Sequence, residues 1–209
     1  MSKNRVIGYV DGFNLYYGIR AKGWKHLYWI DPCTLVGGLV SSAVDVVGVK
    51  YFTARVSHPK EKRERQTKYL DALRAFGDSE VVYGKLSPRS RSCRNCHAQW
   101  TSYEEKMTDS AIAAHLVADA FLDRFDTAIM VGGDTDVVPA IRIVRAHFPE
   151  KTILAWYPPR RKNDAVGHNC HGSDSINHNH LSVALMPNCV EVGNGVVVER
   201  PTRWPAPPK

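Results

Sequence analysis

Short apolar runs alternate with longer amphipathic segments along most of the chain, and this alternation limits the fold more than any other feature. The apolar, β-rich runs predict strands at 6–10, 46–56, 80–86, 128–131 and 151–157. The segments between them predict helices at 15–19, 31–43, 60–76, 102–125 and 137–146. Strands and helices in alternation favour a parallel sheet with helices on both faces. We therefore predict an α/β fold of three layers around a mainly parallel central sheet.

Three stretches lie outside this alternation. The aromatic piece at 24–30 is expected to be extended, and 88–101 is predicted to be an insertion rich in Arg, Ser and Cys. We assign 1–160 to the main domain and 161–209 to a C-terminal extension packed on the same domain. Its proline-rich end, from Pro201 onward, is expected to be a loose tail.

Composition restricts the partners and the compartment. The 209 residues include 28 Lys and Arg against 21 Asp and Glu, a net charge of +7 that favours a polyanionic partner such as nucleic acid. No apolar run approaches the roughly 20 residues of a membrane span, so we expect no membrane contact. The five cysteines form no disulfide framework and no signal-peptide pattern is present, which predicts the reducing cytoplasm.

Acidic side chains follow two of the predicted strands. Asp134 and Asp136 come after the central apolar run and its two glycines, and Asp11 follows the first strand. In an open α/β sheet, ligands bind at the carboxyl ends of the strands. A simpler interpretation is that Asp134 or Thr135 caps the next helix and that Asp11 only belongs to a turn. A helix cap explains only one of the two acids Asp134 and Asp136 and leaves the other unexplained.

A third acidic segment lies at the start of the predicted helix 102–125. Glu105 and Asp109 are four residues apart, a spacing that places them on the same helix face. The helix dipole favours acids at a helix N-terminus, which accounts for Glu104 and Glu105 without a site. Asp109 lies beside the apolar stripe, where a bare carboxylate is costly unless it is paired.

Parallel topology would bring these three acidic segments to one edge of the sheet. Oxygen ligands of the kind that suit Mg²⁺ or Mn²⁺ are supplied by four carboxylates, those of Asp11, Asp109, Asp134 and Asp136. Such ions activate water and stabilise displacement at a phosphodiester. Asn14 and Thr135 are expected to position the phosphate. The sequence therefore predicts a metal-assisted phosphodiester hydrolase.

Other phosphate chemistries lack their motifs. No glycine-rich run ends in Gly-Lys-Ser or Gly-Lys-Thr, which excludes a P-loop nucleotide site. No Ser or Cys stands in a nucleophile elbow. A phosphatase of the haloacid dehalogenase type would carry Asp-x-Asp after its first strand, where this chain has Asp11-Gly12-Phe13.

Three segments together resemble the signature of NYN domains, which belong to the PIN-like nuclease superfamily. They are Val10–Leu15, Glu105–Asp109 and Gly132–Pro139, and the resemblance covers roughly residues 5–160. It implies a Rossmann-like PIN fold, a ribonuclease activity that depends on Mg²⁺ or Mn²⁺, and metal ligands at the four matching aspartates. Asn14 matches the family's polar active-site residue. Where the family often has Ser-Gly-Asp-Ser-Asp, this chain has Gly132-Gly133-Asp134-Thr135-Asp136, which keeps both acids.

Cys93 and Cys96 have the spacing of a zinc knuckle. A structural zinc needs four ligands, and the chain has no second close cysteine pair. Residues that would complete a Zn²⁺ site are His97, His168, Cys170 and His171. Some bacterial NYN proteins, by the same resemblance, carry a Cys-x-x-Cys just before the Glu-Lys segment. The alternative is a reduced pair in a loop, with the histidines as loop residues that have no role.

The basic residues suggest how RNA would be guided. Candidate phosphate contacts are Arg89, Arg91, Arg94, Arg160, Arg161 and the exposed face of Lys60–Lys68. We predict an endoribonuclease, and the alternative is a module that binds RNA or protein and does not cut. Such a module gains nothing from four clustered carboxylates. A homodimer is a further prediction, with Trp24, Tyr28 and Trp29 as exposed interface aromatics.

Overall fold

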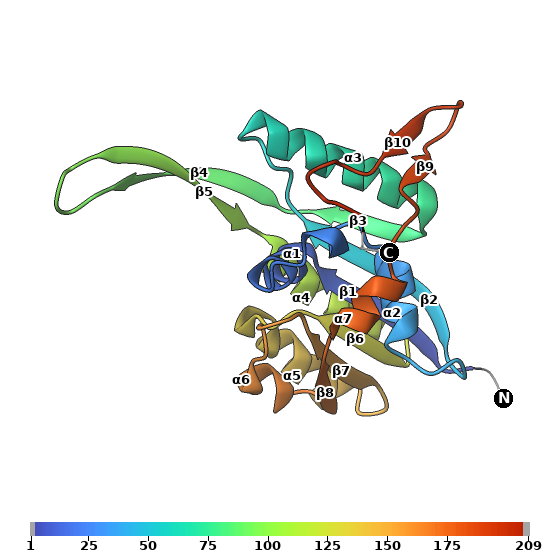
Figure 1. The fold of residues 1–209 in the computed structure, drawn as a ribbon. Helices are drawn as coiled ribbons and strands as arrows, with labels where there is room; N and C mark the ends of the chain where they lie inside the picture. Colours follow the sequence, from blue (N-terminus) through green and yellow to red (C-terminus); the bar gives the residue numbers. More distant parts are fainter. Residues whose placement is uncertain (1–2, 207–209) are drawn as a thin grey trace.

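A computed structural model describes residues 3–206. Its centre is a six-stranded sheet in the order β3-β2-β1-β6-β7-β8, and every neighbouring pair runs parallel (Figure 1). The strands are β1 (Arg5–Asp11), β2 (Asp45–Thr53), β3 (Ser79–Tyr83), β6 (Thr127–Val131), β7 (Thr152–Tyr157) and β8 (Gly172–Ser175). The predicted α/β fold with a parallel central sheet is confirmed. Sequence reasoning missed β8 because its four residues include no apolar side chain.

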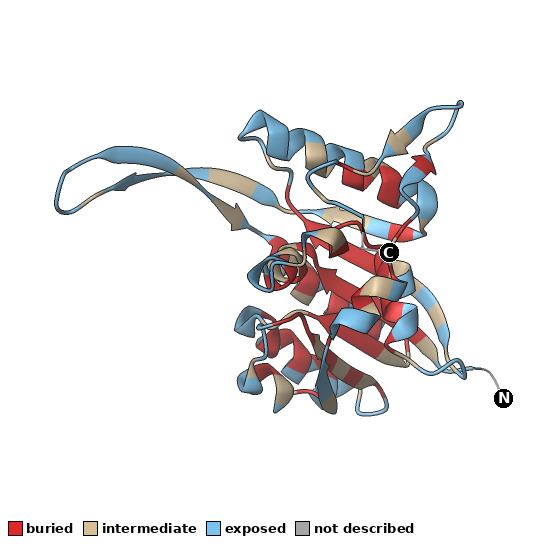
Figure 2. Ribbon diagram, viewed as in Figure 1, coloured by how far each residue is buried: buried red, intermediate tan, exposed pale blue. Residues whose placement is uncertain are grey.

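Helices cover both faces of the sheet and produce three layers (Figure 2). Side chains alternate along β1, so Val6 and Val10 pack on one side while Ile7 and Tyr9 pack on the other. The first side is covered by α1 (Gly12–Ala21), α2 (Pro32–Gly38), α3 (Lys60–Phe76) and α7 (His178–Val183), and the second by α4 (Thr108–Phe121) and α5 (Val138–His147). Within residues 3–206, no helix has the length and apolar character needed to cross a membrane.

A long hairpin replaces the predicted insertion and the first turn of the predicted helix 102–125. Strands β4 (Lys85–Ser92) and β5 (Gln99–Lys106) pair antiparallel and project from the body (Figure 1). The helix prediction is therefore wrong at its start, and α4 begins only at Thr108. Met107 joins the two elements with a left-handed backbone, φ 77°, which a helix cannot continue. Most of the hairpin is exposed on both sides, so its sequence carries no apolar period of two.

The aromatic piece at 24–30 is not extended. It contains the short 3-10 helix η1 (Lys25–Leu27), and the following Tyr28 and Trp29 are buried, with 8% and 0% of their surface exposed. Trp24 is half-buried against the same core. The prediction that these aromatics form an exposed dimer surface is wrong, because their side chains pack in the core of the same chain.

The C-terminal extension packs on both faces of the sheet. The short helix α6 (Asp164–Gly167) lies on the second face, where its Val166 joins the core under α4 and α5. Helix α7 and a two-stranded sheet of β9 (Cys189–Glu191) and β10 (Val197–Glu199) lie on the first face. Trp204 lies in the stretch expected to be loose, yet its ring packs edge-on against Tyr28 at 5.5 Å between centroids. Residues 207–209 of that stretch lie outside the described residues.

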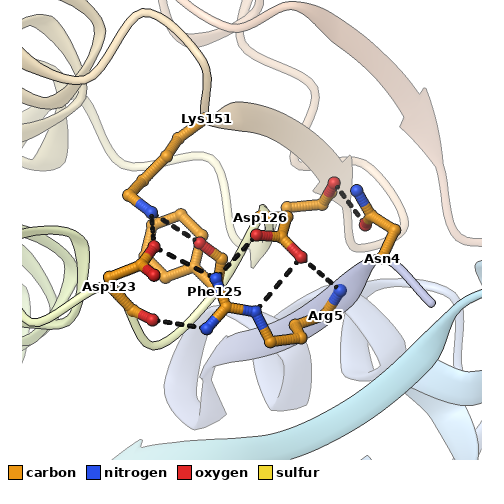
Figure 3. Close-up of polar contacts among 7 residues, drawn as sticks. Asn4, Arg5, Asp123, Phe125, Asp126 and Lys151 are labelled. Atoms are coloured by element: carbon orange, nitrogen blue, oxygen red, sulfur yellow. Dashed lines mark hydrogen bonds and ion pairs between the residues drawn. The ribbon is translucent and has the colours of Figure 1, made fainter. Parts of the chain in front are cut away.

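An ion-pair network closes the amino end of the sheet (Figure 3). Arg5, the first residue of β1, contacts Asp126 at 2.7 Å and Asp123 at 3.0 Å. The buried Lys151 contacts Asp123 at 2.7 Å and donates to the Phe125 carbonyl at 2.8 Å. Hydrogen bonds from Arg5 lower the pKa of Asp126 to about 2. Each of these four charged side chains therefore has a partner of opposite sign.

Candidate metal centre

The carboxyl ends of the two central strands bring Asp11 beside the loop that holds the other acids. Val10 of β1 pairs with Val131 of β6, so Asp11 and Gly132 follow at the same level of the sheet. A Cβ placed on Gly132 would lie 3.4 Å from the Asp11 Cβ, which is a tight contact. The glycine therefore leaves room for the Asp11 side chain above the strand ends.

Three more carboxylates converge at this edge. Asp109, in the first turn of α4, meets Asp134 and Asp136, which flank the start of the 3-10 helix η2 (Thr135–Val137). One oxygen from each of the three lies within 4.8 Å of the others. Within residues 3–206 this is the one group of three or more His, Cys, Asp or Glu side chains with that geometry.

Asp11 and Asp134 also cap helices, as the simpler interpretation of the sequence proposed. Asp11 Oδ1 accepts from the Asn14 amide at 2.9 Å, and Asp134 Oδ1 accepts from the Asp136 amide at 3.0 Å. Each cap uses one oxygen of its carboxylate. The cap holds the side chain in one orientation and leaves the second oxygen available, so capping and ligand binding are compatible.

Glu105 joins the cluster from an unexpected element. It lies on β5, so the predicted helix face shared with Asp109 is wrong. Its Oε1 accepts from the Thr108 amide at 3.0 Å, across the left-handed turn at Met107. Its charge contributes to raising the pKa of both Asp11 and Asp109. The turn, and not helical spacing, brings this fifth carboxylate to the site.

The electrostatics of the cluster are unfavourable without a cation. Burial, together with the charges of Asp109, Glu105 and Asp134, raises the pKa of Asp11 to about 7, although the hydrogen bond from the Asn14 amide opposes the rise. Burial, followed by the charge of Asp134, raises the pKa of Asp109 to about 6. Within residues 3–206, no Lys, Arg or His nitrogen lies within 4.0 Å of any of these carboxylates or of Asp136. A divalent cation would relieve the repulsion.

Two buried oxygens beside the cluster have no hydrogen-bond partner in the described chain. They are Thr108 Oγ1, on a residue only 1% exposed, and Asn14 Oδ1. A Cβ on Gly84 would lie 2.6 Å from Thr108 Oγ1, so only a glycine fits there. These two oxygens could accept hydrogen bonds from water bound to a cation, and the neighbouring carboxylates supply only oxygen ligands. Both features fit a hydrated cation such as Mg²⁺ or Mn²⁺. Sequence reasoning missed Thr108 and Gly84 because neither carries a metal-ligand motif.

The other predicted residues fall into two places. Thr135 is exposed on η2 between the two acids, and Arg161 lies beside them, since its backbone packs against Gly133. Asn163, which sequence reasoning missed, donates to the Gly133 carbonyl at 2.9 Å and fixes this loop. Arg160 directly precedes Arg161 in the segment after β7, and the three other predicted arginines lie in the hairpin: Arg89, Arg91 and Arg94. Of these, Arg89 and Arg91 contact Glu104 at 2.7 and 2.6 Å, which offsets part of their charge.

The cysteine pair lies at the hairpin tip. Cys93 and Cys96 flank a tight turn, and no third ligand among residues 3–206 joins them in a metal-sized group. His168, Cys170 and His171 lie in the α6–β8 region of the body, whereas the tip projects away from the body (Figure 1). The structure therefore does not bring together the four ligands that the sequence offered for zinc.

Comparisons with known proteins show the fold and leave the family open. No family model matches the chain. A curated relative, the 6-hydroxy-3-succinoylpyridine 3-monooxygenase HspA of Pseudomonas putida, is 28% identical over 66% of this chain and 55% of its own length. The chain thus spans about half of that relative. A solved structure of a protein of unknown function from Vibrio parahaemolyticus aligns with a TM-score of 0.56 at 19% identity, over 85% of this chain and 95% of that one.

Proposed function

We propose that this chain is a ribonuclease of the NYN type that hydrolyses RNA phosphodiester bonds, as an endonuclease, with bound Mg²⁺ or Mn²⁺. The observation that carries the proposal is the cluster of Asp109, Asp134 and Asp136 beside Asp11, with raised pKa values at Asp11 and Asp109 and no protein cation in contact among the described residues. A cation bound there would supply an activated water and neutralise charge on the phosphate.

The residues of the chain have separable roles in this reaction. Asp109, Asp134 and Asp136 would hold the cation, and Asp11 would join them directly or through water. The pKa of about 7 at Asp11 suits a proton acceptor for the attacking water. Other groups would bind the substrate. The Asn14 side-chain NH₂ and the Thr135 hydroxyl would donate to phosphate, and Arg160 and Arg161 would contact the RNA backbone.

The test is cleavage of a labelled single-stranded RNA by purified protein in EDTA, in Mg²⁺ and in Mn²⁺. The same assay is run on Asp134→Asn and on Asp45→Asn, a matched exposed change at the amino end of β2. We expect metal-dependent cutting by the parent and by Asp45→Asn, and none by Asp134→Asn. Equal cutting by all three in EDTA would reveal a contaminating ribonuclease and remove the support for this site.

A module that binds RNA or protein without cutting is the alternative, favoured by the arginine-bearing hairpin. It predicts that the parent binds RNA in all three buffers and cuts in none. It also predicts that neutralising all four aspartates leaves RNA binding unchanged, because no carboxylate would contact the strand through a cation.

The relative named as a monooxygenase supports a second enzymatic candidate, oxygenation of a pyridine compound. That reaction would consume O₂ and a reductant, whereas hydrolysis consumes neither. We expect no oxygen uptake when the chain is incubated with 6-hydroxy-3-succinoylpyridine and NADH. Uptake that depends on both compounds would replace the ribonuclease proposal.

A further inference from the structure

A cavity of about 310 Å³ adjoins the acidic cluster. It lies between α1, α3 and the base of the β4–β5 hairpin, with Trp204 of the C-terminal extension on its wall. This volume is within the range of small-molecule sites. No predicted site residue lines the cavity except Lys62 and Arg65 of the α3 face, so sequence reasoning did not predict this cavity.

Aromatic rings make up much of the cavity wall. Phe13 and Tyr17 on α1 stack with centroids 6.3 Å apart, and Tyr16 packs on Tyr28 at 4.8 Å. Tyr17 and Tyr103 keep 42% and 41% of their surface exposed, although both line the cavity. Phe13 packs on the Tyr17 ring and His58 on the Tyr103 ring, so a planar ligand would contact the part of each ring that stays exposed.

The charges around the cavity are all positive. Arg20, Lys62 and Arg65 line it, and no Asp or Glu does. Among residues 3–206, no carboxylate lies within 4.0 Å of any of these three cations. Lys60 of α3, by contrast, pairs with Glu64 one turn away. The Arg20 guanidinium lies 5.9 Å from the Tyr17 ring centroid. Basic side chains without a carboxylate partner, next to partly exposed aromatic rings, fit a ligand that is planar and negatively charged.

The cavity and the acidic cluster meet in the sequence at the start of α1. Gly12 lines the cavity and directly follows Asp11. A Cβ on Gly12 would lie 2.5 Å from the Tyr51 hydroxyl, and Tyr51 also lines the cavity. The backbone that carries Asp11 therefore leads directly into the cavity wall.

We propose that this cavity holds one nucleobase of a single-stranded RNA, stacked on Tyr17 and Tyr103, while the phosphate beside it reaches the acidic cluster. Arg20, Lys62 and Arg65 contact the neighbouring phosphates. Unpaired strands expose their bases for stacking, which a duplex does not. The assignment of the phosphate rests on the proposed ribonuclease function, whereas the base pocket itself is tested separately.

The experiment measures binding without cleavage. In the Asp134→Asn background and in EDTA, fluorescence anisotropy compares a short labelled single-stranded RNA with an oligomer of the same length that lacks all bases. Both ligands are titrated against the Tyr17→Ala/Tyr103→Ala pair, the Tyr17→Phe/Tyr103→Phe pair and Phe76→Ala. Phe76 is a matched control, since it is a 45% exposed aromatic on α3 outside the cavity. Thermal unfolding confirms that each variant is folded.

The background protein is expected to bind RNA more tightly than the baseless oligomer. The alanine pair should weaken RNA binding roughly 5- to 150-fold, the range measured for loss of base–aromatic stacking, and leave the baseless oligomer unaffected. The phenylalanine pair and Phe76→Ala should match the background, because they keep both rings of the pocket.

Three outcomes would overturn the base pocket: no preference for bases, an unchanged preference in the alanine pair, or a free nucleoside monophosphate that binds as tightly as the RNA. The last would assign the pocket to free nucleotides. Failure of the ribonuclease proposal is distinguishable, since a parent that never cuts can still show base-dependent binding that the alanine pair loses.

Discussion

At the amino end of β1, Arg5 contacts Asp126 and Asp123, whereas at the carboxyl end Asp11 faces Asp109 and Asp134 with no cation in contact among the described residues. The two ends thus place the same acidic residue type in opposite settings. Arg5 lowers the pKa of Asp126 to about 2, while burial and neighbouring acids raise that of Asp11 to about 7.

Burial alone does not produce this contrast. Asp119 is 1% exposed, yet hydrogen bonds from Lys50 and Tyr9 lower its pKa despite the opposing effect of burial. Lys50 Nζ lies 2.6 Å from its carboxylate. Asp11 is 8% exposed and has no such partner. The buried Asp119 is therefore paired with a cation, whereas the acids at the carboxyl edge are not, an arrangement that is typical of a ligand site.

The largest expected effect separates the two ends by activity. Asp134→Asn should lower RNA cleavage by at least about 100-fold, because even contacts supporting a metal site cost 10- to 100-fold when removed. Asp126→Asn, at the paired end, should leave cleavage unchanged. Initial rates on labelled RNA in Mg²⁺ measure both. Similar losses in the two variants would mean that the contrast reflects stability and not a site.

The next effect concerns stability at the paired acids. Lys50→Met should lower the free energy of unfolding by about 3 kcal/mol, since it leaves the buried Asp119 without its closest cation. Lys60→Met removes an exposed pair with Glu64 and should change stability by less than about 1 kcal/mol. Urea denaturation of both variants is the measurement. If Lys50→Met has the same free energy of unfolding as the parent, Arg124 and Tyr9 are sufficient partners for Asp119.

A smaller effect of opposite sign is expected at the unpaired end. Asp11→Asn should stabilise the metal-free protein at about pH 8, by an amount on the order of 1 kcal/mol, because it removes a buried charge that repels its neighbours. Asparagine keeps the cap of α1, so the helix is not disturbed. Urea denaturation in EDTA tests the gain, and a loss of stability would show that the Asp11 charge is compensated.

The smallest effect is a pH dependence. The folded-state pKa values of Asp11 and Asp109 lie above those of the unfolded chain, so between about pH 4 and 7 the folded state holds more protons and metal-free stability falls as pH rises. Added Mg²⁺ should therefore raise the melting temperature more at about pH 8 than at about pH 5. Asp126, with its lowered pKa, contributes stability that is lost only below about pH 4. A Mg²⁺ effect independent of pH would contradict the carboxylate site.

The sequence predicted the parallel sheet and the edge position of Asp11, Asp134 and Asp136. Both follow from local patterns, because apolar runs define strands and the carboxyl ends of parallel strands meet at one edge. It failed at residues 102–107, where a two-sided exposed hairpin shows no apolar alternation. Glu105 was therefore assigned to a helix, although it reaches the cluster from a strand.

The remaining features depend on contacts between segments far apart in the chain. The acids at the carboxyl edge have no cation partner because the fold places cations such as Arg5 and Lys151 at the amino end of the sheet. The aromatic cavity is lined by residues from α1, α3, the hairpin and Trp204. No periodic pattern within one segment of the sequence indicates that these elements lie together. Local sequence fixes strands and caps because their interactions span a few residues, whereas charge pairing and cavities arise only when distant elements pack.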